Sequence, residues 1–326
     1  MDDFRLQLIA IPIAAGAASL ALLPVLIRSR LLPQDRPNER SLHVSPVPRS
    51  GGIALILPAL IAGWLAAPPL RLALACAAFL AFVSFLDDLR PMPPLLRLLA
   101  HLAAAGVLMF AGLPQWPLAV ALCTLLGVVW MTNLYNFMDG SDGLAGGMTV
   151  AGFGCYAIIA AAADQTGVTV VSASIAACAL MFLAFNFHPA RIFMGDIGSI
   201  PLGFLAAALG AIGWNEGLWS PLVPLLAFSP FIADATVTLT KRLLAGEKVW
   251  LAHKSHYYQR VIRMGFGHRK TALAAYVLMI TSAASAVAIA GQSAAVQLSV
   301  TAAWAIIYLA LAVVIDRRWR RHEVPA

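Results

Sequence analysis

Long apolar runs, separated by short polar segments, form the dominant pattern along the chain. A membrane-spanning helix needs about 20 mostly apolar residues, and eleven runs approach that length, with boundaries blurred by internal prolines and glycines. The runs lie near residues 6–27, 53–68, 70–86, 96–112, 117–134, 147–163, 168–187, 199–213, 221–240, 271–290 and 296–315. The pattern predicts an all-α, polytopic integral membrane protein with ten to eleven transmembrane helices, in a single transmembrane domain over residues 1–326.

The composition supports the same class. The chain is 61% hydrophobic and 11% charged, whereas a soluble domain carries about 25% charged residues. Asp2 and Asp3 stand where a signal peptide would carry positive charge, so we expect the first run to be a retained span. The four cysteines lie in apolar runs without the spacing of a metal site or a disulfide framework, which favours small buried side chains.

Basic residues predict the orientation. When successive loops alternate across the bilayer, every lysine and arginine except Arg5 and Arg71 falls on one side, in the loops or in the tail after Asp316. The positive-inside rule makes that side cytoplasmic, with the N-terminus outside and the C-terminus in the cytoplasm of an inner-membrane protein. The net charge of +7 then reflects orientation and anionic headgroups, and no nucleic-acid motif competes. The cytoplasmic loops are expected near 28–52, 87–97, 133–147, 187–198 and 241–270.

Aspartates gather at this cytoplasmic rim. A carboxylate in or beside a span costs several kcal/mol unless it is paired, metal-bound or hydrated, so each is a candidate functional residue. None lies at mid-span, where a proton relay or coupled-ion site of a transporter would be expected. The six residues are Asp87, Asp88, Asp139, Asp142, Asp196 and Asp234.

The spacing within the loops adds chemistry. Asn133, Asn136, Asp139 and Asp142 recur every third residue among glycines, a spacing that, if the segment is helical, places two amides and two carboxylates on one face. This pattern indicates a site for a phosphorylated, metal-bearing ligand, although solvated acids at a glycine-rich helix junction are the alternative. The spacing does not fit an EF-hand.

The remaining motifs also suit phosphate. Asp196 lies between two glycines near Arg191 and Phe193, where capping of the next helix is the simpler alternative. His253 and His256 are expected one helical turn apart among basic residues. No further Cys or His lies nearby to complete a zinc site. Histidines among basic residues favour phosphate binding over a merely amphipathic surface helix.

Together these residues predict metal-dependent phosphoryl transfer between a soluble nucleotide donor and a lipid acceptor, because a divalent cation with oxygen ligands and nearby cations activates a diphosphate. Two alternatives stay open. A secondary transporter of an anionic or lipid-linked substrate would show mid-membrane charges and internal symmetry, and we see neither. A scaffold for envelope enzymes would leave the six acids unexplained.

Five ordered motifs between residues 35 and 270 resemble the polyprenyl-phosphate N-acetylhexosamine-1-phosphate transferases. That superfamily includes undecaprenyl-phosphate GlcNAc-1-phosphate transferase and, more distantly, phospho-MurNAc-pentapeptide translocase. The motifs are Asp35-Arg-Pro-Asn-Glu-Arg-Ser-Leu-His43 with Pro48-Arg-Ser-Gly-Gly52, Asp87-Asp88, Asn136-x-x-Asp139-Gly-x-Asp142-Gly143, Phe193-Met-Gly-Asp196-x-Gly-Ser199 and His253-x-x-His256.

The resemblance implies an enzyme that transfers an N-acetylated sugar 1-phosphate from a UDP-sugar to undecaprenyl phosphate and releases UMP. It implies Mg²⁺, with Mn²⁺ as the alternative, a donor, a lipid acceptor and membrane lipid as partners, and a homodimer as an open option. The implied metal ligand is Asp196, and the implied catalytic residues are Asp87, Asp88, Asp139, His253 and His256. The implied substrate-binding residues are Asn136, Asp142, Arg191, Phe193, His43 and Arg49.

Two departures from the family pattern point to a branch. Translocase-like members carry Asp-Asp-x-x-Lys, but Pro91 takes the lysine position here, and Ser255 stands where related enzymes often have another histidine. We therefore expect an enzyme that initiates O-antigen or another surface polysaccharide, with the sugar (GlcNAc, GalNAc, FucNAc or QuiNAc) undecided. Direct attack by the lipid phosphate on the β-phosphorus is favoured, and a covalent route through Asp87 or Asp88 is the alternative.

Overall fold

The computed structural model describes residues 3–29, 32, 34–35, 47–249 and 253–323. Within them, nine helical segments are long and apolar enough to cross a membrane, and α2 is a shorter apolar helix. The chain is therefore a polytopic helical membrane protein. The helices are α1 (Asp3–Arg28), α2 (Gly51–Ala66), α3 (Arg71–Leu89), α4 (Pro94–Val107), α5 (Leu118–Phe137), α6 (Leu144–Ala162), α7 (Thr166–Asn186), α8 (Asp196–Asn215), α9 (Leu222–Ala227), α10 (Ser229–Leu244), α11 (Tyr257–Val261), α12 (Gly267–Ile289) and α13 (Ala294–Glu323).

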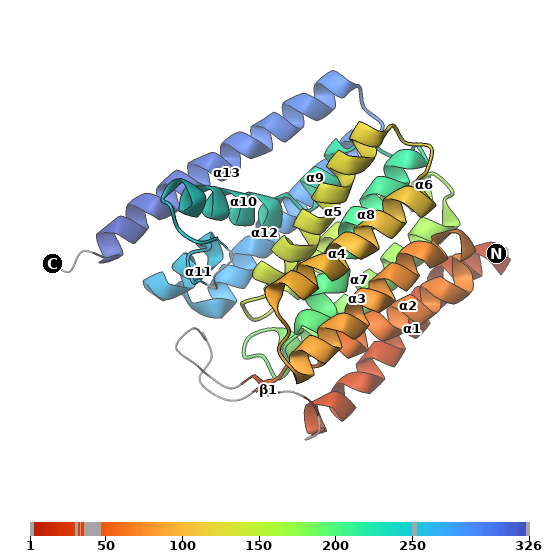
Figure 1. Cartoon of the computed structure of the whole chain (residues 1–326), viewed down its shortest axis with the longest axis horizontal. Coiled ribbons are helices and arrows are strands. Elements are labelled where there is room, and N and C mark those ends of the chain that lie inside the picture. The colour runs from red at the N-terminus through yellow and green to blue at the C-terminus, as the bar shows by residue number, and fades with distance from the viewer. Residues whose placement is uncertain (1–2, 30–31, 33, 36–46, 250–252, 324–326) are drawn as a thin grey trace.

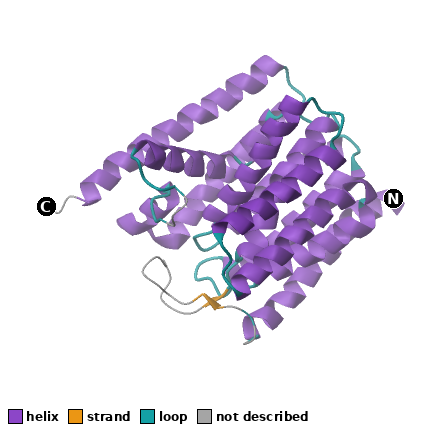
Figure 2. Ribbon diagram, in the orientation of Figure 1, coloured by secondary structure: helices purple, strands orange, loops and turns teal. Residues whose placement is uncertain are grey.

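Short elements connect the helices. A two-stranded antiparallel sheet pairs β1 (Gln34–Asp35) with β2 (Val47–Pro48). Single turns occur at η1 (Pro68–Leu70), η2 (Leu108–Gly112) and η3 (Ile262–Phe266). The strands lie at one end of the bundle, beside long loops (Figure 2). The first turns of α1 and the last turns of α13 lie at opposite ends (Figure 1).

The region 221–240, which the sequence predicts as one continuous span, is interrupted in the structure. The structure has two helices there, α9 and α10, which meet at Phe228. Pro230 lies in the first turn of α10 and has no N–H to continue the preceding helix. The hydroxyl of Ser229 donates to the carbonyl of Leu226 at 2.7 Å, so the break is locally satisfied. An apolar run alone could not reveal this interruption.

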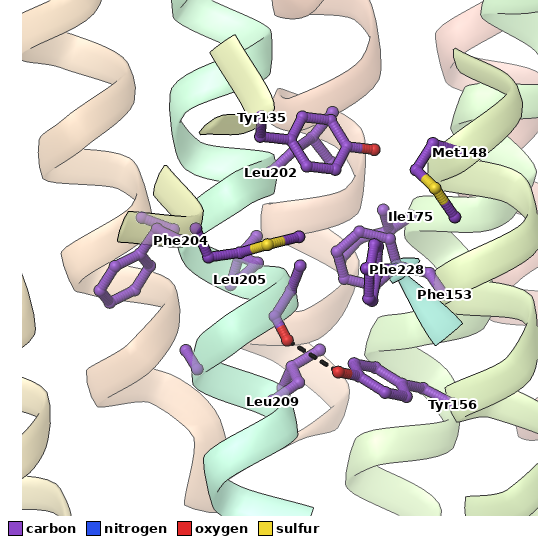
Figure 3. Packing of buried hydrophobic residues seen from close by; sticks show 14 of the residues in the cluster. Tyr135, Met148, Phe153, Tyr156, Ile175, Leu202, Phe204, Leu205, Leu209 and Phe228 are labelled. Carbon is purple, nitrogen blue, oxygen red and sulfur yellow. Dashed lines mark hydrogen bonds between the residues drawn. The ribbon is translucent and has the colours of Figure 1, made fainter. Parts of the chain in front are cut away.

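Helix α8 lies at the centre of the bundle, and α13 is the most exposed of the long helices. Gly203 lets α8 approach α5 closely, because a methyl group there would lie 2.7 Å from the carbonyl oxygen of Met131. Beside α8, Tyr135, Phe153, Tyr156 and Phe228 pack edge to face with ring centroids 5.6–6.4 Å apart. Figure 3 shows this cluster and the hydrogen bond from Tyr156 Oη to the carbonyl of Ala206, 2.9 Å long. A rigid core thus supports the loops at the helix ends.

Candidate active site

Three of the predicted aspartates meet two arginines where α3 ends and α8 begins. Arg49 Nη2 lies 3.2 Å from Asp88 Oδ1 and 3.5 Å from Asp196 Oδ1. Arg97 Nη1 lies 3.3 Å from Asp87 Oδ2 and 3.8 Å from Asp196 Oδ2. Segments that are far apart in the sequence therefore form one charged cluster.

Backbone pairing brings Arg49 to Asp196. Gly51 N–H donates to the carbonyl of Phe193 at 2.9 Å, and Gly52 N–H donates to that of Met194 at 2.8 Å. Gly195 has a φ of +71°, and a methyl group there would overlap the carbonyl oxygen of Arg49. Glycine is thus required at this crossing, where the backbone adopts a conformation that other residues rarely take.

The adjoining residues of the 133–147 segment border this cluster. Ser199 Oγ donates to Asn136 Oδ1 at 3.1 Å, which ties the end of α5 to the start of α8. Asp139 is half-buried, and burial together with the negative charges of Asp196 and Asp88 raises its pKa well above the usual value. Burial lowers the pKa of Arg49, but the charges of Asp88 and Asp196 outweigh that effect and raise it overall.

The charges in this cluster do not balance. Four carboxyl groups, those of Asp87, Asp88, Asp139 and Asp196, lie around two guanidinium groups, so the acids outnumber the cations even when Asp139 is protonated. Among the described residues no three His, Cys, Asp or Glu side chains converge as a ready-made metal site. Magnesium needs only one or two carboxylates when substrate phosphates and water complete its shell. Asp196, with Asp88 beside the same guanidinium, offers the oxygen donors that fit such a site.

Asp142 belongs to a second cluster. Its Oδ2 lies 2.6 Å from Nδ1 of His188 and accepts the N–H of Ala190 at 3.2 Å. His268 stacks on His188 with ring centroids 5.5 Å apart and an interplanar angle of 4°. Sequence reasoning missed both histidines, since His268 is far away in the sequence, and only the proximity of His188 to Arg191 could have drawn attention to it.

Asn186 was also missed. It accepts the N–H of Gly143 at 2.9 Å and donates to the carbonyl of Ile192 at 2.9 Å. This buried amide joins the 139–143 loop to the 191–195 loop, and it therefore connects the two clusters. Arg191 is exposed, with its guanidinium over the ring of Phe185 at 4.6 Å, and Phe193 is half-buried.

The two motif histidines do not share a helix, contrary to the expected spacing of one helical turn. Helix α11 begins at Tyr257, so His253 lies in the preceding loop and His256 directly precedes the helix. Asp234 is part of this arrangement and lies apart from the other acids: its carboxylate accepts the N–H groups of Tyr257 and Tyr258 at 2.9 and 3.0 Å. Its role at this point is to cap α11.

The histidines nevertheless lie beside the 133–147 segment. The rings of His253 and His256 are 4.8 Å apart, and His256 stacks on Phe137 at 6.4 Å. Tyr258 Oη donates to the carbonyl of Phe137 at 3.2 Å. Burial, together with the charges of His256 and Arg242, lowers the pKa of His253 to about 4. His43, the remaining predicted residue, lies outside the described residues.

An apolar cavity of about 570 Å³ lies between α5, α8, α9 and α10. It is lined by Val128, Met131 and Leu134 of α5, and Phe228 and Ile232 border it where α9 gives way to α10. On α5 the lining runs from Ala119 to Leu134 and on α8 from Ala206 to Trp214, so only the Leu134 end of the cavity points toward the charged cluster. Residues on both sides of the break between α9 and α10 thus line this cavity, and one continuous helix over 221–240 would change its shape.

Comparison with known proteins gives consistent results. A family model described as glycosyl transferase family 4 matches residues 70–213. A probable undecaprenyl-phosphate N-acetylglucosaminyl 1-phosphate transferase from Bacillus subtilis is 29% identical over 92% of this chain and 89% of its own. A decaprenyl-phosphate N-acetylglucosaminephosphotransferase from Mycobacterium leprae is 30% identical over 77% and 75%. A phospho-N-acetylmuramoyl-pentapeptide-transferase from Symbiobacterium thermophilum is 33% identical over 65% and 76%.

Proposed function

The chain belongs to glycosyl transferase family 4, among the polyprenyl-phosphate glycosyl-1-phosphate transferases, and from that premise we propose that it transfers an N-acetylated sugar 1-phosphate from a UDP-sugar to undecaprenyl phosphate. The observation that carries the proposal is the cluster of four acidic side chains and two arginines at one end of the bundle, and an apolar cavity extends from Leu134 toward the other end. The charged groups suit a diphosphate with its cation, and the cavity suits a prenyl tail. The secondary-transporter alternative gains no support from this arrangement.

The reaction needs little proton transfer, because a lipid phosphate is already ionised near pH 7. An oxygen of the lipid phosphate attacks the β-phosphorus of the donor, the bond from that phosphorus to the bridging oxygen breaks, and UMP leaves. Arg49 and Arg97 orient the phosphates. Asp87 accepts the N–H of Met92 at 2.6 Å and a hydrogen bond from Arg97, and it thereby holds the Arg97 guanidinium in place.

Asp196 and Asp88 would hold Mg²⁺, or Mn²⁺ in its place. When bound, the cation neutralises charge at the reacting phosphorus and on the leaving oxygen. Asn136 and Asp139 line the diphosphate site, Asp142 and Phe193 receive the uracil, and Arg191 and the histidines border the sugar phosphate. The active site faces the cytoplasm of the inner membrane, where the enzyme initiates O-antigen or another surface polysaccharide.

The test is a donor panel. Membranes that contain the protein, undecaprenyl phosphate and Mg²⁺ should release UMP with at least one UDP-N-acetylsugar. Asp196→Asn should lose at least about a hundredfold in kcat, since a metal ligand is removed. Asp164→Asn is the matched control, because Asp164 lies in the turn at the far end of α6 and asparagine tolerates its φ of 54°. Release of no UMP with any donor, or full activity of Asp196→Asn, would contradict the proposal.

The covalent route has its own assay. An aspartyl-phosphate on Asp87 or Asp88 would exchange labelled UMP into the UDP-sugar without any lipid acceptor. Direct attack predicts no exchange under those conditions.

A further inference from the structure

The protonation state of His253 follows from its hydrogen bonds. Its Nδ1 accepts the backbone N–H of Ser255 at 3.3 Å and lies 2.9 Å from the hydroxyl of the same residue. A backbone amide can only donate, so Nδ1 must carry a lone pair. The proton of the neutral ring is then on Nε2, and the doubly protonated imidazolium is incompatible with this arrangement.

Arg242 fixes the direction of the serine hydroxyl. Its Nη1 donates to Ser255 Oγ at 3.2 Å, and a guanidinium has no acceptor. The hydroxyl proton of Ser255 is therefore available for Nδ1 of His253. Arg242 is itself held by Glu247 at 3.0 Å, and its side chain is only 11% exposed. A relay of three side chains thus runs from Arg242 through Ser255 to His253.

His256 differs from His253 at Nδ1. Its Nδ1 lies 3.2 Å from Oδ1 of Asp234, a carboxylate that also accepts the N–H groups of Tyr257 and Tyr258. An ionised carboxylate can only accept, so Nδ1 of His256 carries a proton, unlike Nδ1 of His253. The two neighbouring rings, 4.8 Å apart, thus differ at Nδ1, which accepts a hydrogen bond in His253 and donates one in His256.

We propose that Ser255 and Arg242 are positioning residues that hold His253 in the neutral Nε2–H tautomer, so that His253 donates a hydrogen bond to a phosphate oxygen and does not act as a general base. The tautomer follows from the geometry alone, and the identity of the phosphate rests on the proposed function. Ser255 replaces the further histidine that related enzymes often have, and it gives Nδ1 a donor that does not titrate near neutral pH. The low pKa of His253 agrees with this arrangement.

The tautomer can be measured without substrate. In protein labelled with ¹⁵N-histidine, the ring nitrogen shifts distinguish N–H from lone-pair nitrogen, and comparison with His253→Gln assigns the signal. We expect the Nε2–H form at pH 7 in the wild type and in Ser255→Thr. Ser255→Ala should show a mixture of tautomers, because it loses the hydroxyl at 2.9 Å and keeps only the longer backbone bond of 3.3 Å at Nδ1. A protonated Nδ1 in the wild type would overturn the proposal, whatever the transferase assay shows.

Activity assays distinguish a hydrogen-bond donor from a general base at position 253. His253→Gln retains an amide N–H donor, whereas His253→Ala does not, so kcat/KM should be at least about fivefold higher for Gln, as one hydrogen bond to a charged group predicts. A general base would leave both variants equally inactive, which would overturn the proposed role.

The positioning residue has a matched series. Ser255→Ala should lower kcat/KM about two- to tenfold, as expected for one neutral hydrogen bond, and Ser255→Thr should restore it. Ser299→Ala, which removes an exposed hydroxyl bonded to the carbonyl of Ala295 within α13, should match the wild type. Wild-type activity in Ser255→Ala would contradict the relay. Absence of activity in the wild type for every donor would refute the proposed function, and the NMR result would still decide the tautomer.

Discussion

At the scale of single residues, charge and hydrogen bonding assign each polar group a distinct task. Asp234 illustrates the point, because its carboxylate accepts two backbone N–H groups and contacts His256, and it thereby holds the start of α11 in place. Asp196 is shared between Arg49 and Arg97 at 3.5 and 3.8 Å, and under the proposed function a metal and a substrate take the place of these contacts. Identical residue types thus serve structure in one place and chemistry in another.

Stability should depend on pH through His253. Its pKa of about 4 in the folded protein lies below the value of about 6.5 in an unfolded chain. Between these values only the unfolded state binds the proton, so the His253 contribution is complete above pH 6.5 and is lost as the pH falls toward 4. Thermal unfolding in detergent should show the Tm advantage of the wild type over His253→Gln shrinking across that window. His322→Gln, on the exposed last turn of α13, is the control, and an advantage that stays constant from pH 7 to 4 would contradict this assignment.

At the scale of elements, glycine crossings decide where the functional side chains meet. The start of α2 and the start of α8 approach so closely that a methyl group on Gly52 would overlap the backbone of Gly198. This contact, together with the 193–195 segment, sets Arg49 against Asp196. The crossing is therefore as important to the site as the charged residues themselves.

Gly195→Ala should disable this crossing. A φ of +71° with a ψ of 170° is available essentially to glycine alone and costs other residues roughly 1–3 kcal/mol, to which the clash with Arg49 adds. We expect a lower Tm and loss of most UMP release. Gly217→Ala has a φ of +72° with open space around it, so its Tm should fall less and its activity should persist. Equal activity of Gly195→Ala and the wild type would show that the crossing does not matter.

At the scale of the whole molecule, the charged clusters lie together at one end of the helix bundle. The clusters around Asp196, Asp142 and His256 lie on loops at one end of the helices, while the 163–165 turn lies at the other end of α6. Basic residues concentrate at the charged end, as the ion pairs of Arg49, Arg97 and Arg242 indicate. The positive-inside rule then predicts which end faces the cytoplasm.

Labelling of intact cells tests that orientation. In a background without the four native cysteines, a membrane-impermeant thiol reagent should modify Asp164→Cys directly and Glu247→Cys only after permeabilisation. The same two variants in opened membranes provide the control for reactivity. The reverse pattern would invert the proposed topology and place the site outside the cytoplasm.

The sequence by itself determined the membrane class, most spans and the acidic residues of the candidate site, because lipid demands long apolar runs and penalises every charge within them. The same physics made Asp87, Asp88, Asp139 and Asp196 visible without any structure. It could not separate Asp234 from them, since a capping carboxylate and a catalytic one look alike in a sequence.

Only the tertiary structure decided the rest. The break between α9 and α10, the pairing of Arg49 with Asp88 and Asp196, and the stacking of His188 on His268 depend on contacts between residues distant along the chain. Periodicity and hydropathy are local quantities, whereas these contacts depend on which helices pack together. The residue types therefore indicated the class of chemistry, but the partner of each residue could be identified only from the packed bundle.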